Sequence, residues 1–156
     1  MFNINGYKEK IDNFFEIILI NKDIVNIKLL EDNWTLKEMI GHLIDSASNN
    51  HQRIIRLQID KKLDFPIFYE DDWKNITKIN DFDFLELIKF WKGYNYFLLY
   101  IIEKIDEGKL KNTWEVNGKE WTLEFTVNDY FEHLDWHIDL YKNRMEEIKK
   151  VIFVPD

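Results

Sequence analysis

The stretch TLKEMIGHLIDSASNNHQRIIRLQI, residues 35–59, repeats apolar side chains at alternating intervals of three and four. This spacing places one face of an α-helix against a core. Thr35, followed three residues later by Glu38, forms a capping-box signature that marks a helix start. We therefore expect a helix that starts after Asn33 and continues to about Ile59. The apolar stripe consists of Leu36, Ile40, Leu43, Ala47, Ile54 and Leu57, and it also includes Asn50.

Three further segments show helical spacing of apolar residues. They predict helices at about residues 4–20, at about residues 82–106, and from near Thr126 to about residue 149. Residues 60–81 do not show helical spacing of apolar residues, so we predict a loop there. A loop of this length often acts as a lid over a site. Residues 114–121, WEVNGKEW, alternate around an Asn-Gly pair and predict a β-hairpin.

Together these elements predict an all-α fold, a four-helix bundle with a long loop between helices 2 and 3 and a small β-hairpin before the last helix. The long crossing between the second and third helices permits a topology other than up-down-up-down. The chain has 156 residues, no internal repeat and no linker rich in proline and glycine. We therefore expect residues 1–156 to form a single domain.

Composition excludes several classes of protein. The formal net charge is −8 without a basic stripe, so we expect no nucleic-acid partner. The absence of cysteine excludes disulfides, iron–sulfur clusters and thiolate zinc sites, and it fits a reducing compartment. No apolar run is long enough for a signal peptide or a spanning helix. We expect a cytoplasmic protein without a membrane partner.

The chain has four histidines, and three of them are candidates for a metal site. His133 and His137 lie four residues apart and share a helical face, where two imidazoles can converge on one ion. His42 lies in the middle of the second predicted helix and can face the last helix across the bundle. Gly41 beside it is costly in a helix and indicates a close approach by a neighbouring backbone. His51 falls on the opposite side of that helix and is expected at the surface or behind the site.

The alternative is that these histidines are ordinary polar groups bordering an apolar face. If they do hold an ion, three imidazoles and an open position allow it to activate water or a thiol, or to polarise a carbonyl. Imidazole suits several divalent metal ions. We expect Zn²⁺ or Ni²⁺ first, with Fe²⁺ and Mn²⁺ also compatible.

Other polar residues are candidates for supporting roles. Asp45 is expected to accept a hydrogen bond from a metal-bound imidazole, with a solvated carboxylate as the alternative. Asn50 is expected to orient water or substrate and, because it falls on the apolar stripe, to have a buried partner. Arg53 is expected to bind an anionic substrate or a thiol carboxylate, with an ordinary surface arginine or ion pair as the alternative. Asp72 and Trp73 are expected to close over the site from the long loop.

The chain resembles the DinB/YfiT-like superfamily of metal-dependent four-helix-bundle enzymes. The resemblance rests on NWTLKEMIGHLIDS at residues 33–46, NNHQR at residues 49–53 and EHLDWH at residues 132–137. It implies that His42 is the first metal ligand and that His133 and His137 are the second and third. It also implies a homodimer. Relatives include transferases and isomerases that use low-molecular-weight thiols, and proteins described as metal-dependent hydrolases.

We therefore predict a metal-dependent enzyme acting on a small molecule, either a hydrolase or a thiol-dependent S-transferase. A low-molecular-weight cosubstrate must supply the thiol, because the chain has no cysteine. The alternative is a non-catalytic, metal-stabilised module for ligand binding or interaction. If the histidines are merely buried, the chain holds no stoichiometric metal.

Overall fold

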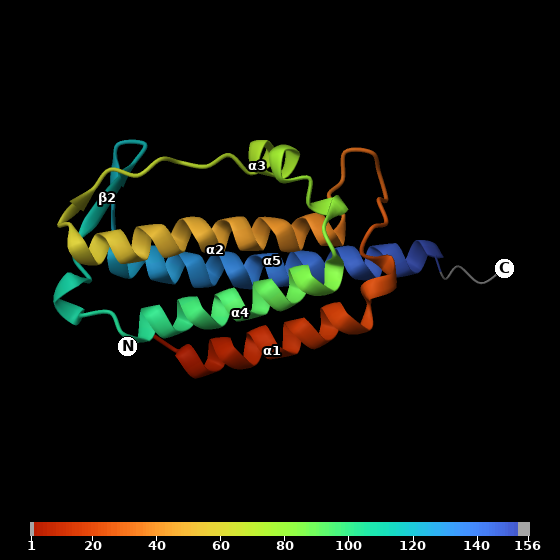
Figure 1. The fold of residues 1–156 in the computed structure, drawn as a ribbon, viewed down its shortest axis with the longest axis horizontal. Coiled ribbons are helices and arrows are strands. Elements are labelled where there is room, and N and C mark those ends of the chain that lie inside the picture. Colours follow the sequence, from red (N-terminus) through yellow and green to blue (C-terminus); the bar gives the residue numbers. More distant parts are fainter. Residues whose placement is uncertain (1, 153–156) are drawn as a thin grey trace.

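Four long helices lie alongside one another in the computed structural model, which describes residues 2–152 (Figure 1). They are α1 (Ile4–Ile20), α2 (Leu36–Ile59), α4 (Phe84–Glu103) and α5 (Leu123–Ile152). Helices α1 and α5 run in one direction, and α2 and α4 run in the other. Because α2 and α4 are parallel, the chain must return along the whole bundle between them. The four-helix bundle is confirmed, and its order is not up-down-up-down.

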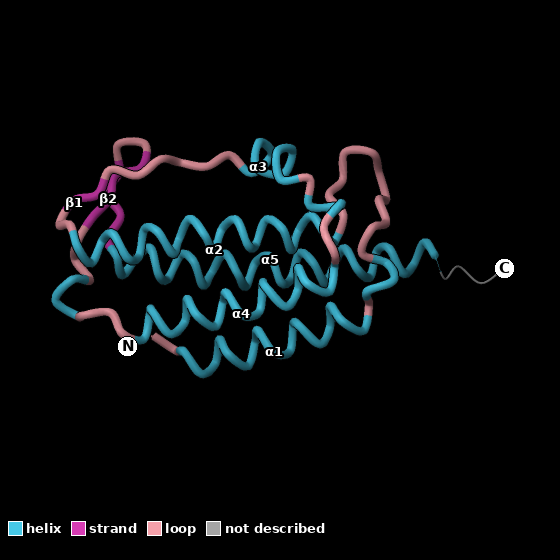
Figure 2. The backbone as a smooth tube through the Cα atoms, in the orientation of Figure 1, coloured by secondary structure: helices cyan, strands magenta, loops and turns pink. Residues whose placement is uncertain are grey.

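The returning segment, residues 60–83, has more structure than the predicted loop. It contains strand β1 (Lys62–Leu63), helix α3 (Glu70–Thr77) and a turn of 3₁₀ helix at Ile79–Asp81. Glu70, Asp71 and Asp72 occupy the first turn of α3, where negative charge is favourable beside the free N–H groups. We call residues 60–83 the crossing segment; it runs along α2 from the strands to α3 (Figure 2).

The predicted hairpin forms from β2 (Thr113–Val116) and β3 (Lys119–Thr122), which pair antiparallel. Asn117 and Gly118 take positive φ values of 50° and 75°, as a two-residue hairpin turn requires. Strand β1 pairs parallel with β2 and adds a third strand to the hairpin.

The predicted start of the last helix, near Thr126, is wrong by about one turn. Helix α5 begins at Leu123, and the Thr122 hydroxyl accepts a hydrogen bond from the Phe125 N–H at 3.1 Å. The Thr126 hydroxyl instead accepts from the Trp114 indole N–H at 3.0 Å and donates to the Thr122 carbonyl at 2.9 Å. Thr126 therefore joins the sheet to α5. Helix α4 spans Phe84–Glu103, slightly shorter than predicted.

The predicted capping box at the start of α2 is present. The Thr35 hydroxyl accepts from the Glu38 N–H at 3.0 Å, and the Glu38 carboxylate accepts from the Thr35 N–H at 2.7 Å. The same carboxylate accepts from the Asn80 side-chain amide at 2.9 Å. The buried Lys37 ammonium donates to the carbonyls of Asn80 and Phe82. The first turn of α2 therefore fixes the end of the crossing segment.

Apolar side chains from all four long helices fill the centre of the bundle. Phe14 of α1 meets Trp91 of α4 and Tyr141 of α5 edge-on, with ring centroids 5.3 and 5.0 Å away. None of the helices within residues 2–152 is both long and apolar enough to span a membrane. The largest fully buried side chains are Trp91, Tyr141, Phe14, Ile11, Ile18, Leu36, Ile40, Ile54, Leu57, Ile88, Leu98 and Leu99.

Gly41 has the close neighbour that its place in a helix indicated, but that neighbour is a side chain. A Cβ atom on Gly41 would lie 2.9 Å from Cγ1 of Ile79 in the crossing segment. Gly93 in the middle of α4 provides a contrast, because a Cβ atom there would meet nothing within 4 Å.

We expect opposite effects from alanine at these two glycines. Gly93→Ala gains helix propensity in open space and should stabilise the fold by up to about 1 kcal/mol. Gly41→Ala gains the same propensity but must displace Ile79, which costs about 1–3 kcal/mol, so a net destabilisation of about 1 kcal/mol is expected. Urea unfolding followed by circular dichroism measures both. Equal stabilisation by the two substitutions would contradict the close packing of Ile79 on α2.

Candidate metal centre

Helices α2 and α5 bring three of the four histidines together. Nε2 of His137 lies 3.0 Å from Nε2 of His42 and 3.0 Å from Nε2 of His133. The three candidate ligand atoms all lie within 4.8 Å of one another. We call His42, His133 and His137 the histidine triad. The predicted pairing of residues on α2 and α5 is therefore present in the fold.

The antiparallel packing of α2 and α5 sets this geometry. His42 and Ser46 lie one turn apart on α2, and they face His137 and His133, also one turn apart on α5. The Ser46 hydroxyl lies 3.4 Å from Nδ1 of His133. Asp135, between the two histidines of α5, points elsewhere, and its carboxylate pairs with Lys10 of α1 at 2.7 Å.

Burial keeps the triad neutral. Desolvation lowers the pKa of His42, and it lowers the pKa of His133 to about 4 and that of His137 to about 3. The neighbouring imidazoles lower the last two pKa values further, while Glu70 acts in the opposite direction on His133. The imidazoles are therefore in the neutral form, which is the form that ligates a metal ion.

The donor set fits a divalent cation better than it fits internal hydrogen bonding. Nε2 of His137 faces two other Nε2 atoms. A neutral imidazole nitrogen forms one hydrogen bond, either as donor or as acceptor, so it cannot bond to both neighbours. If Nδ1 carries the hydrogen in each ring, three lone pairs converge. Tetrahedral coordination at zinc–nitrogen distances separates two ligand nitrogens by roughly 3.3 Å, close to the spacing here. Nδ1 of His42 and Nδ1 of His137 are buried without a hydrogen-bond partner among residues 2–152.

Residues of the crossing segment cover the triad, and sequence reasoning missed the nearest of them. The Glu70 carboxylate lies 3.9 Å from Nε2 of His42, and its side chain is 60% exposed. A cavity of about 410 Å³ is lined by His42, His133, Phe68, Tyr69, Glu70 and Asp71. Glu70 is the first residue of the acidic run in α3, and its position over the triad depends on where α3 begins.

A second opening of the site lies on the His137 side. It has a volume of about 270 Å³ and is bordered by Trp34, Met39, Trp136, Leu140 and Arg144, among others. The Trp34 ring meets the His42 ring edge-on at 5.6 Å, and the Trp136 ring meets that of His137 at 4.5 Å. The site therefore has one acidic entrance beneath α3 and one aromatic entrance beside it.

The other predicted site residues lie at different distances from the triad. Asp45 shares a narrow crevice with His42, and burial raises its pKa to about 6. No hydrogen bond joins Asp45 to a histidine within residues 2–152. Asn50 is buried, and its amide donates to the Ser46 carbonyl at 3.0 Å, so it has the buried partner that we expected. His51 stands apart, with Nδ1 2.9 Å from the Tyr94 hydroxyl.

Arg53 is buried, so it is not the ordinary surface arginine that we considered as the alternative from the sequence. Only 8% of it is exposed, and its guanidinium lies over the Trp114 ring at 4.4 Å. Of the two loop residues expected to close over the site, Trp73 is half-buried against Phe68, with ring centroids 5.4 Å apart. Asp72 is exposed and lines neither entrance.

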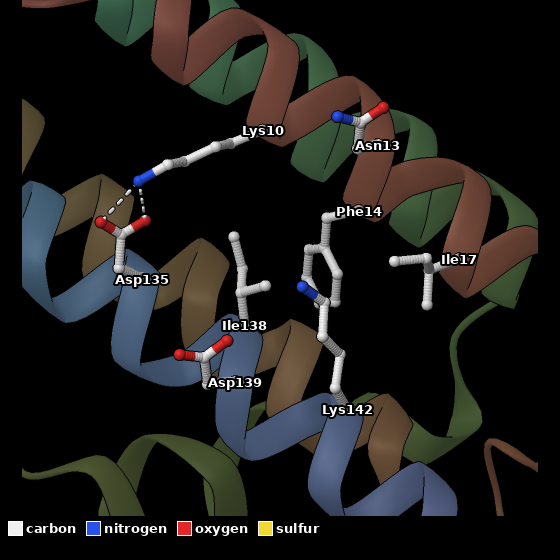
Figure 3. Close-up of a pocket in the computed structure, with 8 residues that line it drawn as sticks. All are labelled: Lys10, Asn13, Phe14, Ile17, Asp135, Ile138, Asp139 and Lys142. Atoms are coloured by element: carbon white, nitrogen blue, oxygen red, sulfur yellow. Dashed lines mark hydrogen bonds and ion pairs between the residues drawn. The ribbon is translucent and has the colours of Figure 1, made fainter.

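A further cavity, between α1 and α5, does not reach the triad. Figure 3 shows Lys10, Phe14 and Ile17 of α1 facing Asp135, Ile138 and Lys142 of α5 across a space of about 330 Å³. The Lys10–Asp135 ion pair spans one end of it. No histidine lines this cavity, so it is separate from the candidate metal centre.

Neither a family model nor a curated protein sequence matches the chain. Among solved structures, the chain is similar to YfiT from Bacillus subtilis, which is described as a probable metal-dependent hydrolase with an unusual four-helix bundle topology. The two are 15% identical, with a TM-score of 0.68, over 93% of this chain and 87% of that chain. This similarity concerns the fold, and it supports the four-helix bundle that the sequence predicted.

Proposed function

We propose that the chain is a metal-dependent hydrolase acting on small molecules, with a divalent ion held by His42, His133 and His137. The convergence of three neutral Nε2 atoms, 3.0 Å apart at two contacts, carries the proposal. The cavity of about 410 Å³ beside them offers room for a small substrate. When bound, the ion supplies Lewis acidity that activates water or a thiol, or polarises a carbonyl.

The surrounding residues have distinct roles in this proposal. Glu70 presents a carboxylate at the edge of the triad, where it can accept a hydrogen bond from the attacking water and orient it. Ser46 steadies His133 through Nδ1, and Asn50 lies 3.5 Å from the Ser46 hydroxyl, so Asn50 acts as a positioning residue. Asp45 is proposed as the carboxylate that steadies the His42 ring.

The metal site is tested by the metal content of untagged protein. Wild type should hold about one equivalent of Zn²⁺ or Ni²⁺ by elemental analysis, and His133→Ala/His137→Ala should hold none, because two of three ligands are gone. His51→Ala is the matched control and should keep its metal, since His51 contacts Tyr94 instead of the triad. An unchanged metal content in the double variant would exclude the triad as the site.

The role of Glu70 is tested by turnover of small esters and amides. Glu70→Gln should lower the turnover number at least about tenfold while metal content stays unchanged, because an oriented hydrogen bond to the attacking water is lost. Asp72→Asn, on the same helix but lining neither entrance, should leave turnover unchanged.

The same substrate panel distinguishes hydrolysis from its alternatives. A thiol-dependent S-transferase would require an added low-molecular-weight thiol for any turnover. A metal-stabilised binding module would show no turnover, yet a chelator would lower its melting temperature, because an ion that binds only the folded state stabilises it. Equal turnover by wild type and Glu70→Gln would remove Glu70 from the proposal without affecting the triad.

We also propose that the chain forms a homodimer through the outer face of α4. Phe90, Phe97 and Tyr100 are at least half exposed there, and Ile55 and Ile59 of α2 add exposed apolar surface. The Phe97 ring meets the His51 ring of α2 edge-on, so the two helices share this face. An uncharged contact suits two copies that each carry a net charge of −8.

Light scattering after size exclusion tests the dimer. Wild type should elute at twice the monomer mass, and Phe90→Glu/Phe97→Glu should elute as a monomer, because the contact would bury like charges. Ile20→Glu, at an exposed apolar position at the end of α1, is the control and should remain a dimer. A dimeric double variant would place the interface elsewhere.

A further inference from the structure

Arg53 carries a positive charge into the protein, and within residues 2–152 no anion forms a hydrogen bond or ion pair with it. The residue is 8% exposed, and its Nε is fully buried without a hydrogen-bond partner. No ion pair or hydrogen bond joins the guanidinium to another residue in the described range, 2–152. Asp129 on α5 acts on Arg53 only through space. A buried charge without a partner is costly, so its retention points to an anion that binds there.

Aromatic side chains hold the guanidinium in place. The Trp114 ring lies 4.4 Å from the guanidinium carbon, and the Phe65 ring lies 5.3 Å from it. Trp114 is fixed in turn by its hydrogen bond to Thr126. Rings that contact the face of a guanidinium leave its edge as the donor surface. That edge is a planar fork of N–H groups, which matches a planar carboxylate in two parallel hydrogen bonds.

Arg53 lies on the same face of α2 as the histidine triad. It follows His42 by eleven residues, which is close to three full helical turns. The α2 residues between them on this side are buried and polar, namely Ser46, Asn49 and Asn50. Both amide side chains donate to carbonyls of their own helix. A polar track therefore extends from the triad toward Arg53.

The crossing segment covers both ends of this track. Phe65 lies against Arg53, and Phe68 lies against His42 with ring centroids 6.2 Å apart. The eleven residues from His42 to Arg53 rise by about 16 Å along α2. The anion position and the triad are therefore separated by roughly 15 Å, a distance that one elongated small molecule can bridge.

We propose that Arg53 binds the carboxylate of an elongated substrate whose reacting group lies at the histidine triad. This inference rests on the proposed function for the location of the reacting group, but the carboxylate site itself does not. The substrate class is a carboxylic acid that carries its hydrolysable bond roughly 15 Å from the carboxylate. The two aromatic contacts and the buried polar residues of α2 select an extended, largely uncharged connection between the two ends.

Substitutions at Arg53 distinguish a residue that binds a carboxylate from one that only stabilises the fold. Replacing buried charged groups by apolar side chains of similar volume is often neutral or stabilising. Arg53→Met should therefore fold and melt no lower than wild type while losing carboxylate binding. Arg53→Lys keeps the charge but loses the planar fork, and should bind carboxylates more weakly than wild type. Arg56→Met, one turn further on at an exposed position, is the matched control.

The first experiment uses metal-free protein and hexanoate, with neutral hexanamide and inorganic phosphate as comparison probes. At tenfold excess over its dissociation constant, hexanoate should raise the melting temperature of wild type and of Arg56→Met by about 3 °C. It should not change that of Arg53→Met, and hexanamide should have no effect on any variant. No shift with hexanoate in wild type, or the same shift in Arg53→Met, would overturn the proposal. A response to phosphate as large as that to hexanoate would overturn its assignment to carboxylates.

The second experiment uses metal-loaded protein and tests whether one ligand contacts both Arg53 and the metal ion at the triad. Its probes are dodecanedioic acid monohydroxamate and dodecanohydroxamic acid, which share a metal-binding end and differ in the terminal carboxylate. Wild type should bind the carboxylate form at least about tenfold more tightly, and Arg53→Met should bind the two equally. Equal binding by wild type would overturn the link between Arg53 and the triad. If neither hydroxamate binds, the proposed metal site fails, and the hexanoate experiment still decides the role of Arg53.

Discussion

The register between α2 and α5 is the constraint on which the site depends. His42 meets His137 because the two helices are antiparallel and neither is displaced along the other. A slide of one turn is about 5.4 Å, enough to separate the imidazoles entirely. Contacts at both ends of α2 oppose such a slide. Thr35 and Glu38 bind Asn80 at one end, and the Asn112 amide donates to the Leu57 carbonyl at the other.

The site also places a polar cluster within an otherwise apolar bundle. Imidazoles and a guanidinium are desolvated there, and several of their nitrogens lack hydrogen-bond partners among residues 2–152. Such groups weaken the fold unless something else binds them. The aromatic rings of Phe14, Trp91 and Tyr141 pack against one another in the bundle, and their burial offsets this cost.

Helical periodicity was enough to predict the four long helices, because each spans several turns and buries one continuous stripe. Helix α3 escaped prediction because its eight residues include none that is buried. The start of α5 was misplaced because the Thr126 hydroxyl bonds to Trp114, a partner distant from any capping position. The triad could be predicted from spacing within one helix and from the resemblance. The surroundings of Glu70 and Arg53 could not be predicted from the sequence, because both depend on the path of the crossing segment.

That path has an evolutionary consequence. Within the crossing segment, none of residues 64–80 is buried, yet Phe65, Phe68 and Glu70 stand directly over the polar face of the bundle. Insertions or replacements there change what the site can accept at little cost to the hydrophobic core. Chains of this architecture can therefore diversify in substrate choice by altering one surface segment, while selection for a stable bundle acts on other positions.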